Sequence, residues 1–325
     1  MTEMSKPQRS RSIADNVKLK APFFPSPVPA AREVLKVLPL SDLHLSACPS
    51  ATEKIISNAD YFARMDHVVL LGDMVGAYGT DGEYLELAKF IRKIQKPYSA
   101  INGNHEFYFR VYHENSPNYK RLWTEGTPDE KTSQLEKFTS FFGMESLWKM
   151  EKNELGVFIF LGLDGVDRYK AETLSEAQLN FLEAALSQSQ NTPTYVFCHA
   201  PLYLDRRLDM DYYDNERTAC VELKGVLREL MEARRAPLFW MSGHIHLRPD
   251  HYLFPPSQLK PNVWQIHCPD SWGYSRWARE HVIPQRHEGL FSRHLEIEPN
   301  RATFVAHDHH LQQDIARETV EFDKL

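Results

Sequence analysis

The sequence predicts an α/β protein with at least one partly parallel sheet and helices packed outside it. Short continuous runs of β-branched and other apolar residues alternate with longer amphipathic segments, which is typical of buried strands covered by helices. The last third of the chain holds strand patterns only, as an antiparallel sheet would. With 325 residues, the chain has room for one large domain or two small ones.

Each expected strand is a short apolar run, and each expected helix has apolar residues at helical spacing. The expected strands are 34–40, 67–71, 98–101, 156–163, 194–198, 238–242, 263–268, 290–297 and 302–307. The expected helices are 52–64, 83–94, 175–187 and 220–234. In the third helix, Ser175 is the expected N-cap and Gln178 its capping-box partner. We expect residues 1–33, charged and then rich in proline, to form an arm, residues 34–307 the domain, and residues 308–325 a charged tail.

The composition argues against several classes of protein. Hydrophobic (42%) and charged (25%) contents are ordinary for a globular protein, and the net charge of -6 argues against long nucleic acid as a partner. The N-terminus lacks the apolar core of a secretory signal, and no stretch reaches the roughly 18 apolar residues of a membrane span. Cys48, Cys198, Cys220 and Cys268 form no C-x-x-C pair and are expected as reduced thiols. The expected location is therefore the cytoplasm.

Residues of the kinds that bind metal ions follow five of the expected strands. They are Asp42 and His44 in SDLHL, Asp73 in GDMVG, Asn104 and His105 in GNHE, His199 in CHAP, and His244 and His246 in GHIH. Taken singly, an aspartate there is usually a turn or cap residue, and a histidine is more often structural. Taken together they favour one site, because the carboxyl ends of parallel strands share an edge of the sheet.

The order and spacing of these motifs resemble the calcineurin-like metallophosphoesterases. That family has D-x-H, G-D-x-x-D, G-N-H-(D/E), a lone H and G-H-x-H in this order, and the resemblance extends from about residue 34 to about residue 307. One position departs from the pattern, because the second acid of G-D-x-x-D is Gly76 here. That position supports the site rather than binding metal, so the departure concerns the surroundings of the ligands.

The resemblance implies a four-layer αββα sandwich of two mixed β-sheets and a pair of divalent metal ions. One ion would be held by Asp42, His44, Asp73 and His246, and the other by Asp73, Asn104, His199 and His244. Asp73 would bridge the two ions. Such a mixed nitrogen and oxygen site without thiolate suits manganese or iron, with zinc also possible. Cys198 is expected to point to the opposite face of its strand and away from the site.

The expected reaction is hydrolysis of a phosphate ester by in-line attack of a metal-bridging hydroxide, with the two cations neutralising the phosphate. The resemblance makes His105 a transition-state stabiliser or the acid that protonates the leaving oxygen. Glu106 is expected to orient the imidazole of His105. The favoured substrate is a nucleotide or another small phosphodiester. The alternatives are a phosphomonoesterase or protein phosphatase, a pyrophosphatase, a nuclease, and a metal-free scaffold of the same fold.

Three loop regions, 107–121, 203–217 and 272–279, are expected to cover the site. Their arginines that could make a second contact to phosphate are Arg110, Arg206, Arg207 and Arg276. For each of them a solvated surface position is the alternative. The cluster of His307, Asp308, His309 and His310 resembles a metal motif by composition, but a solvated or packing role is favoured at the start of a charged tail.

Overall fold

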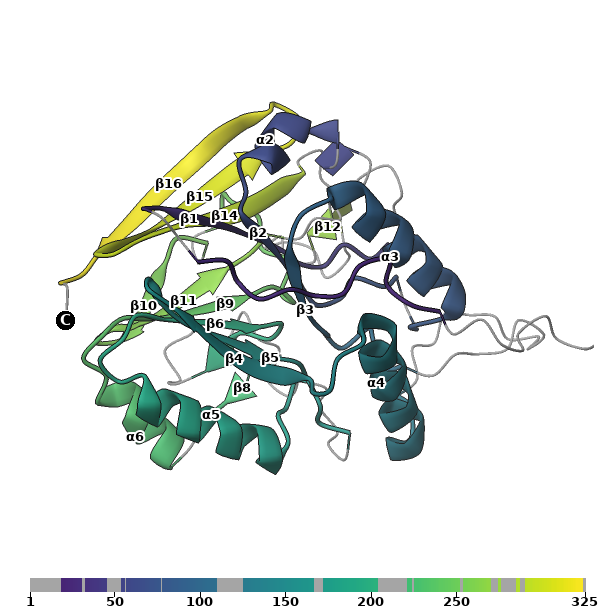
Figure 1. Cartoon of the computed structure of the whole chain (residues 1–325), viewed down its shortest axis with the longest axis horizontal. Helices are drawn as coiled ribbons and strands as arrows, with labels where there is room; N and C mark the ends of the chain where they lie inside the picture. The colour runs from purple at the N-terminus through teal and green to yellow at the C-terminus, as the bar shows by residue number, and fades with distance from the viewer. Residues whose placement is uncertain are drawn as a thin grey trace, which may run out of the picture.

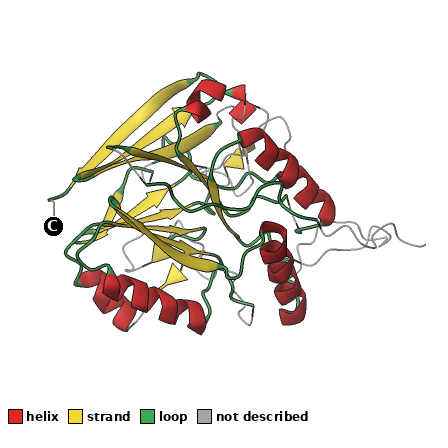
Figure 2. Cartoon of the chain, in the orientation of Figure 1, coloured by secondary structure: helices red, strands yellow, loops and turns green. Residues whose placement is uncertain are grey.

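Two six-stranded mixed sheets lie face to face with helices on their outer sides (Figures 1 and 2), which confirms the expected four-layer sandwich. The computed structural model describes residues 19–30, 33–45, 54–55, 57–76, 78–109, 125–166, 172–203, 221–223, 225–251, 254–269, 274–275, 285–286 and 290–323. Within these residues, no helix combines the length and the apolar character needed to cross a membrane.

The first sheet has the strand order β16-β15-β14-β1-β2-β3. Its strands are β1 (Leu35–Leu40), β2 (His67–Leu71), β3 (Tyr98–Ile101), β14 (Phe291–Glu298), β15 (Arg301–Asp308) and β16 (Gln313–Glu321). Strands β1, β2 and β3 run parallel, and β14, β15 and β16 join them through antiparallel pairs. Residues 308–325, expected as a tail, therefore contain an edge strand. The strand was missed because its side chains are mostly polar and exposed.

The second sheet has the order β10-β11-β9-β6-β5-β4. Its strands are β4 (Trp148–Asn153), β5 (Gly156–Leu161), β6 (Thr194–Cys198), β9 (Leu238–Ser242), β10 (Ser257–Lys260) and β11 (Val263–His267). The four central strands are parallel, whereas β4 and β10 are antiparallel edges. The described residues also form two small two-stranded sheets. They pair β7 (Leu202–Tyr203) with β8 (Val221–Glu222) and β12 (Tyr274–Ser275) with β13 (Gln285–Arg286).

Alternate residues of the central strands face two different cores. In β2, Val69 belongs to the core between the sheets, and Val68 and Leu70 belong to the core that includes the helices. Phe239 of β9 and Phe304 of β15 meet between the sheets, with ring centroids 5.3 Å apart. A strand buried on both faces reads as an unbroken apolar run, which is why the sequence predicted these strands well.

The helices are α2 (Ala59–Ala63), α3 (Asp81–Ile94), α4 (Pro128–Phe142), α5 (Glu176–Gln188) and α6 (Val226–Glu232). Helices α5 and α6 cover the second sheet, and α2 and α3 lie on the outer side of the first (Figure 1). Ser175 caps α5 as expected, accepting a hydrogen bond from the backbone N–H of Gln178. The side chain of Gln178 donates instead to the carbonyl of Gly162 at 2.8 Å, so half of the expected capping box forms.

The described part of the arm, residues 19–30, packs along one side of the sandwich. The N–H of Ser26 donates to the carbonyl of Tyr98 in β3, at 2.8 Å. The N–H of Val28 donates to a carboxylate oxygen of Glu151 in β4, at 2.7 Å. Because β3 and β4 are edge strands of different sheets, the arm joins the two edges on this side.

Candidate dinuclear metal site

Eight residues that the sequence singled out lie at the carboxyl ends of five parallel strands. They are Asp42 and His44 after β1, Asp73 after β2, Asn104 and His105 after β3, His199 after β6, and His244 and His246 after β9. Three of these strands belong to the first sheet and two to the second, so the site lies where the carboxyl edges of both sheets meet. The His244 side chain is slightly exposed, at 12%, and the other seven side chains are buried.

Backbone hydrogen bonds hold the strand ends together within each sheet. The N–H groups of Asp42 and His44 donate to the carbonyls of Gly72 and Asp73, at 3.1 and 3.0 Å. In the second sheet, the N–H of Gly243 donates to the carbonyl of His199 at 3.0 Å. These bonds hold the loops after β1 and β2 side by side, and likewise the loops after β6 and β9.

Two further hydrogen bonds cross from one sheet to the other at the site. The Nδ1 atom of His199 lies 2.9 Å from the carbonyl oxygen of Leu71 at the end of β2. The backbone N–H of His244 donates to Oδ2 of Asp42 at 3.0 Å. Since a carbonyl oxygen can only accept, Nδ1 of His199 carries the proton and Nε2 faces the site.

The backbone of the site is left-handed at five of the predicted ligands. The φ angles are 54° at Asp42, 42° at His44, 52° at Asp73, 68° at His244 and 52° at His246. Such a conformation costs a non-glycine residue on the order of 1–3 kcal/mol, and it persists where the surrounding structure enforces it. In the loop after β1 this backbone turns the side chains of Asp42 and His44 towards the centre. In the loop after β9 it does the same for His244 and His246.

Two glycines allow the loops to approach one another. A Cβ atom on Gly72, whose φ is 91°, would lie 2.7 Å from the ring of His199 and from the backbone nitrogen of Gly103. A Cβ atom on Gly103 would lie 2.7 Å from the backbone nitrogen of Asp73 and would also overlap its carboxylate. A side chain at either position would therefore push the site residues apart.

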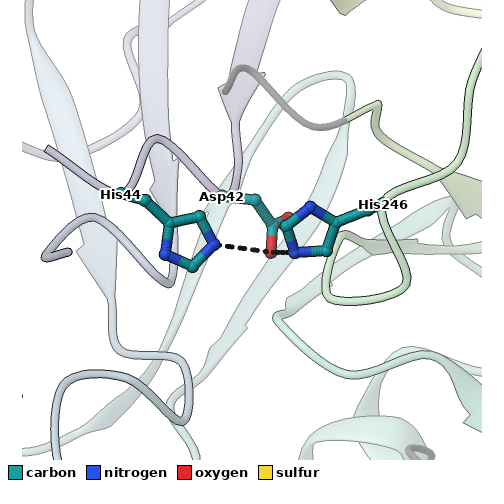
Figure 3. A group of neighbouring side chains, drawn as sticks. All are labelled: Asp42, His44 and His246. Atoms are coloured by element: carbon teal, nitrogen blue, oxygen red, sulfur yellow. Dashed lines mark ion pairs between the residues drawn. The ribbon is translucent and has the colours of Figure 1, made fainter. Parts of the chain in front are cut away.

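The first group of candidate ligands is Asp42, His44 and His246 (Figure 3). The Nε2 atom of His246 lies 3.3 Å from Oδ1 of Asp42, and the Nε2 atom of His44 lies 4.0 Å from the same oxygen. The two imidazoles are stacked, with centroids 5.3 Å apart and planes inclined by 14°. Both nitrogens thus converge on one carboxylate oxygen.

A second group consists of Asp73, His199 and His244, and a third of Asp73, His44 and His105. The Nε2 atom of His199 lies 3.2 Å from Oδ2 of Asp73 and 3.9 Å from Oδ1 of Asp42. Because Asp73 belongs to both groups and His199 reaches both carboxylates, the groups form one continuous centre.

The electrostatics of the metal-free centre are those of a buried charge cluster. Burial works against a charge on His199, but the carboxylates of Asp73 and Asp42 outweigh it and raise the pKa of the imidazole to about 10. Burial would raise the pKa of Asp73, but the charges of His199 and His105 hold it well below its usual range. Burial, together with the charge of His105, lowers the pKa of His44 to about 3. A cation that binds here would displace a proton from His199.

The donor atoms fit divalent metal ions. Among the described residues, Oδ1 of Asp42 and Oδ1 of Asn104 are buried acceptors without a hydrogen-bond partner. Leaving a buried acceptor without a hydrogen bond costs about 1–3 kcal/mol, and bound cations would satisfy these two oxygens. Carboxylate, amide and imidazole atoms are together the mixed donor set of such sites. Cys198 belongs to the core that includes the helices, as expected. These buried clusters are consistent with a dinuclear metal site.

The imidazole of His105 is held by the backbone of the residue that departs from the family pattern. Its Nδ1 atom lies 3.2 Å from the carbonyl oxygen of Gly76, so Nδ1 carries a proton. Its Nε2 atom lies 3.8 Å from Oδ2 of Asp73, and its ring stands edge-on to that of His44 with centroids 4.4 Å apart. A backbone carbonyl therefore orients the ring without an acidic side chain at position 76.

The expectation that Glu106 orients His105 is wrong. Its carboxylate accepts backbone N–H groups instead, from Asp73 at 3.0 Å, Met74 at 2.7 Å, Val75 at 3.2 Å and Gly103 at 2.7 Å. Burial, and then the charge of Asp73, raises the pKa of Glu106 to about 7. Glu106 thus fixes the backbone of two ligand-bearing loops. The sequence could not distinguish this role, because both need an acid at the same position.

The remaining predicted residues have different outcomes. Arg110, Arg206, Arg207 and Arg276 lie outside the described residues. His307 and His309 are buried, which is the packing role that the sequence favoured, and His310 is exposed. Sequence reasoning missed Glu172, whose Oε1 atom lies 3.3 Å from Nε2 of His244. Its loop follows β5 at the same edge of the second sheet, which is the signal that identified the other loops.

Comparison with known proteins settles the family. The model of the family described as calcineurin-like phosphoesterase matches residues 35–248, which is more than half of the 325 residues. The chain belongs to the calcineurin-like phosphoesterase family. Its buried clusters of aspartate and histidine are candidate metal sites of a metallophosphoesterase. Comparison with curated proteins gives no match.

Solved structures share the fold at low sequence identity. A purple acid phosphatase from yellow lupin (Lupinus luteus) seeds is 16% identical, with a TM-score of 0.57 over 92% of this chain and 55% of that one. PhoD is 10% identical, with a TM-score of 0.53 over 93% and 72%. GAP50, described as the anchor in the inner membrane complex of Plasmodium, is 12% identical, with a TM-score of 0.51 over 90% of each chain. The chain spans little more than half of the lupin protein.

Proposed function

We propose that this protein is a dinuclear metal-dependent phosphodiesterase that acts on a nucleotide or another small phosphodiester. The observation that carries the proposal is the convergence of buried carboxylates and imidazoles from five strand ends on one centre. The two buried acceptors without hydrogen bonds, on Asp42 and Asn104, support it further. Such an arrangement is costly without cations and becomes favourable when they bind.

We assign the proposed ligands to two ions that share Asp73. One ion would be held by Asp42, His44, Asp73 and His246, and the other by Asp73, Asn104, His199 and His244. The shared role of Asp73 is supported by its presence in two of the three ligand groups. Its carboxylate is held in place by the backbone N–H of His105, which donates to Oδ1 at 2.9 Å. The donor set favours manganese or iron and allows zinc.

When bound, a pair of divalent ions neutralises the phosphate and lowers the pKa of a coordinated water. The protein supplies the rest of the reaction through its own side chains. Glu106 keeps the loops of Asp73 and Gly103 fixed through its backbone contacts. His105, whose Nδ1–H donates to the carbonyl of Gly76, presents Nε2 to the site. When the ring is protonated on both nitrogens, Nε2–H can donate to a phosphate oxygen or give its proton to the leaving oxygen.

A phosphomonoester carries up to two negative charges, whereas a phosphodiester carries one. A comparison of the two substrate classes therefore tests how much fixed positive charge the site offers to phosphate. The net charge of -6 disfavours long nucleic acid.

The experiment compares hydrolysis of bis-p-nitrophenyl phosphate with that of p-nitrophenyl phosphate by purified protein with added manganese. The control is Asp73→Asn, which keeps the shape of the shared ligand but removes its charge. We expect turnover of the diester that is lost in the variant. Faster turnover of the monoester would replace the proposal by a phosphatase. A protein that binds no metal and hydrolyses neither substrate would instead support the metal-free scaffold.

A further inference from the structure

One carboxylate at the site belongs to none of the motifs that identified the family. Glu172 lies in the loop between β5 and α5, and its Oε1 atom is 3.3 Å from Nε2 of His244. The two side chains are 16% and 12% exposed, so the contact is largely shielded from water. The carboxylate therefore lies beside the group of residues proposed to hold the second ion.

His244 uses its ring nitrogens differently from the other proposed ligands. Nε2 of His199 faces Oδ2 of Asp73 at 3.2 Å, and Nε2 of His246 faces Oδ1 of Asp42 at 3.3 Å. Nε2 of His244 faces Glu172 instead. A carboxylate accepts a hydrogen bond from Nε2–H, so the lone pair of His244 then resides on Nδ1.

The loop that carries Glu172 is pinned at its base. Asp164, which follows β5, accepts hydrogen bonds from the backbone N–H and the hydroxyl of Ser175, both at 2.6 Å. The side chain of Gln178 donates to the carbonyl of Gly162 at 2.8 Å. Both contacts tie the end of β5 to the start of α5, so Glu172 stands three residues before an anchored helix N-terminus. The backbone that follows Glu172 is therefore anchored to the end of β5.

We propose that Glu172 is a positioning residue for the second metal ion. Its carboxylate holds the Nε2–H of His244 and so directs Nδ1 of that imidazole at the ion that Asp73 and His199 also bind. This inference rests on the proposed function, because it needs the ion to be there. Carboxylates that accept the second N–H of a metal-bound imidazole fix its tautomer and orientation, and their loss typically weakens metal binding roughly 10- to 100-fold.

The test is a calorimetric titration of manganese into metal-free protein, for wild type, Glu172→Ala and Glu172→Gln. In Glu172→Ala we expect the affinity for the second ion to fall roughly 10- to 100-fold and the affinity for the first to be unchanged. Glu172→Gln should recover much of that loss, because its amide oxygen can accept the same hydrogen bond. The matched control is Glu176→Ala, which removes an exposed carboxylate four residues further along the chain.

A second readout is the electron paramagnetic resonance spectrum of the manganese pair. At a manganese level that gives an exchange-coupled spectrum in wild type, Glu172→Ala should give the spectrum of isolated ions. Two unchanged binding steps in Glu172→Ala would overturn the proposal, as would equal weakening of both steps with a lowered melting temperature. If wild type binds two ions and hydrolyses the phosphodiester, the proposed function stands whatever this variant does. A wild-type chain that binds no ion overturns both.

Discussion

Residues at the site have two different roles. Some present a side chain to the centre, and others hold those residues in place through hydrogen bonds. Asp42 and Asp73 present carboxylates to the centre from a left-handed backbone. Glu106 and the carbonyl of Gly76 fix the surrounding loop and the imidazole of His105. Because these roles are separate, substitutions at the two kinds of position should have different effects on metal content and on turnover.

Replacement of His105 should separate turnover from metal binding. Its ring faces the site but is not among the proposed ligands, so we expect His105→Ala to lower kcat by about 10²- to 10⁴-fold with unchanged metal content. Steady-state kinetics with elemental analysis of the same sample measures both quantities. His310→Ala, at an exposed position, is the control. Loss of metal from His105→Ala would make this residue a ligand or a structural element.

The contact between the loops after β2 and β3 should not tolerate even a methyl group. A Cβ on Gly103 would lie 2.7 Å from the backbone nitrogen of Asp73 and from a ring carbon of His199. Gly103→Ala should therefore lower the melting temperature and abolish hydrolysis. Gly82→Ala, in the first turn of α3 with its nearest contact at 3.9 Å, should be neutral or stabilising. Equal behaviour of the two variants in thermal unfolding would contradict this account.

At the scale of elements, the strands could be predicted and several connections could not. β2, β3, β6 and β9 have the predicted bounds, because strands buried on both faces leave an unambiguous apolar run. The polar edge strands β4 and β16 leave no such signal, and α4 was not predicted although Thr127 and Glu130 form a capping box at its start. The site residues were predictable because each follows a strand. Their left-handed backbone and the reach of Glu172 depend on contacts between loops far apart in sequence.

The arm should stabilise the fold through its contact with β3. The hydroxyl of Tyr98 donates to the carbonyl of Phe23, so Tyr98→Phe leaves that arm contact unmade. We expect a loss of about 1 kcal/mol in the free energy of unfolding and faster proteolysis within residues 19–30. Tyr195→Phe is the control, because the buried hydroxyl of Tyr195 has no hydrogen-bond partner among the described residues. A stability loss in the control but not in Tyr98→Phe would contradict the arm's role.

At the scale of the whole molecule, buried histidines outside the site should make the fold sensitive to acid. His309 is buried and its Nε2 atom lies 2.9 Å from the hydroxyl of Ser292. Burial, and then the charges of His307 and His310, lowers the pKa of His309 from 6.5 to about 3. Between these pH values the unfolded chain binds a proton that the folded chain does not. The contribution of His309 to the free energy of unfolding is therefore fully present above pH 6.5 and is lost as the pH falls toward 3.

Denaturant unfolding at several pH values, with a chelator present, measures this effect. His309→Gln should make the decline of the free energy of unfolding below pH 6.5 shallower, by at most about 1.4 kcal/mol per pH unit. His310→Gln removes only the smaller of the two charges that act on His309, so it should change the slope less than His309→Gln does. An unchanged slope in His309→Gln would show that His309 does not titrate differently in the folded and unfolded chains.

The central claim is that one buried centre binds two divalent ions through a shared carboxylate. The most direct measurement is the number of manganese ions per chain after equilibrium dialysis, for wild type, Asp73→Asn and the exposed-position control Asp129→Asn. The account predicts two ions in wild type and in the control, and fewer in Asp73→Asn. A wild-type chain without bound manganese, or an Asp73→Asn chain that binds as many ions as wild type, would contradict it.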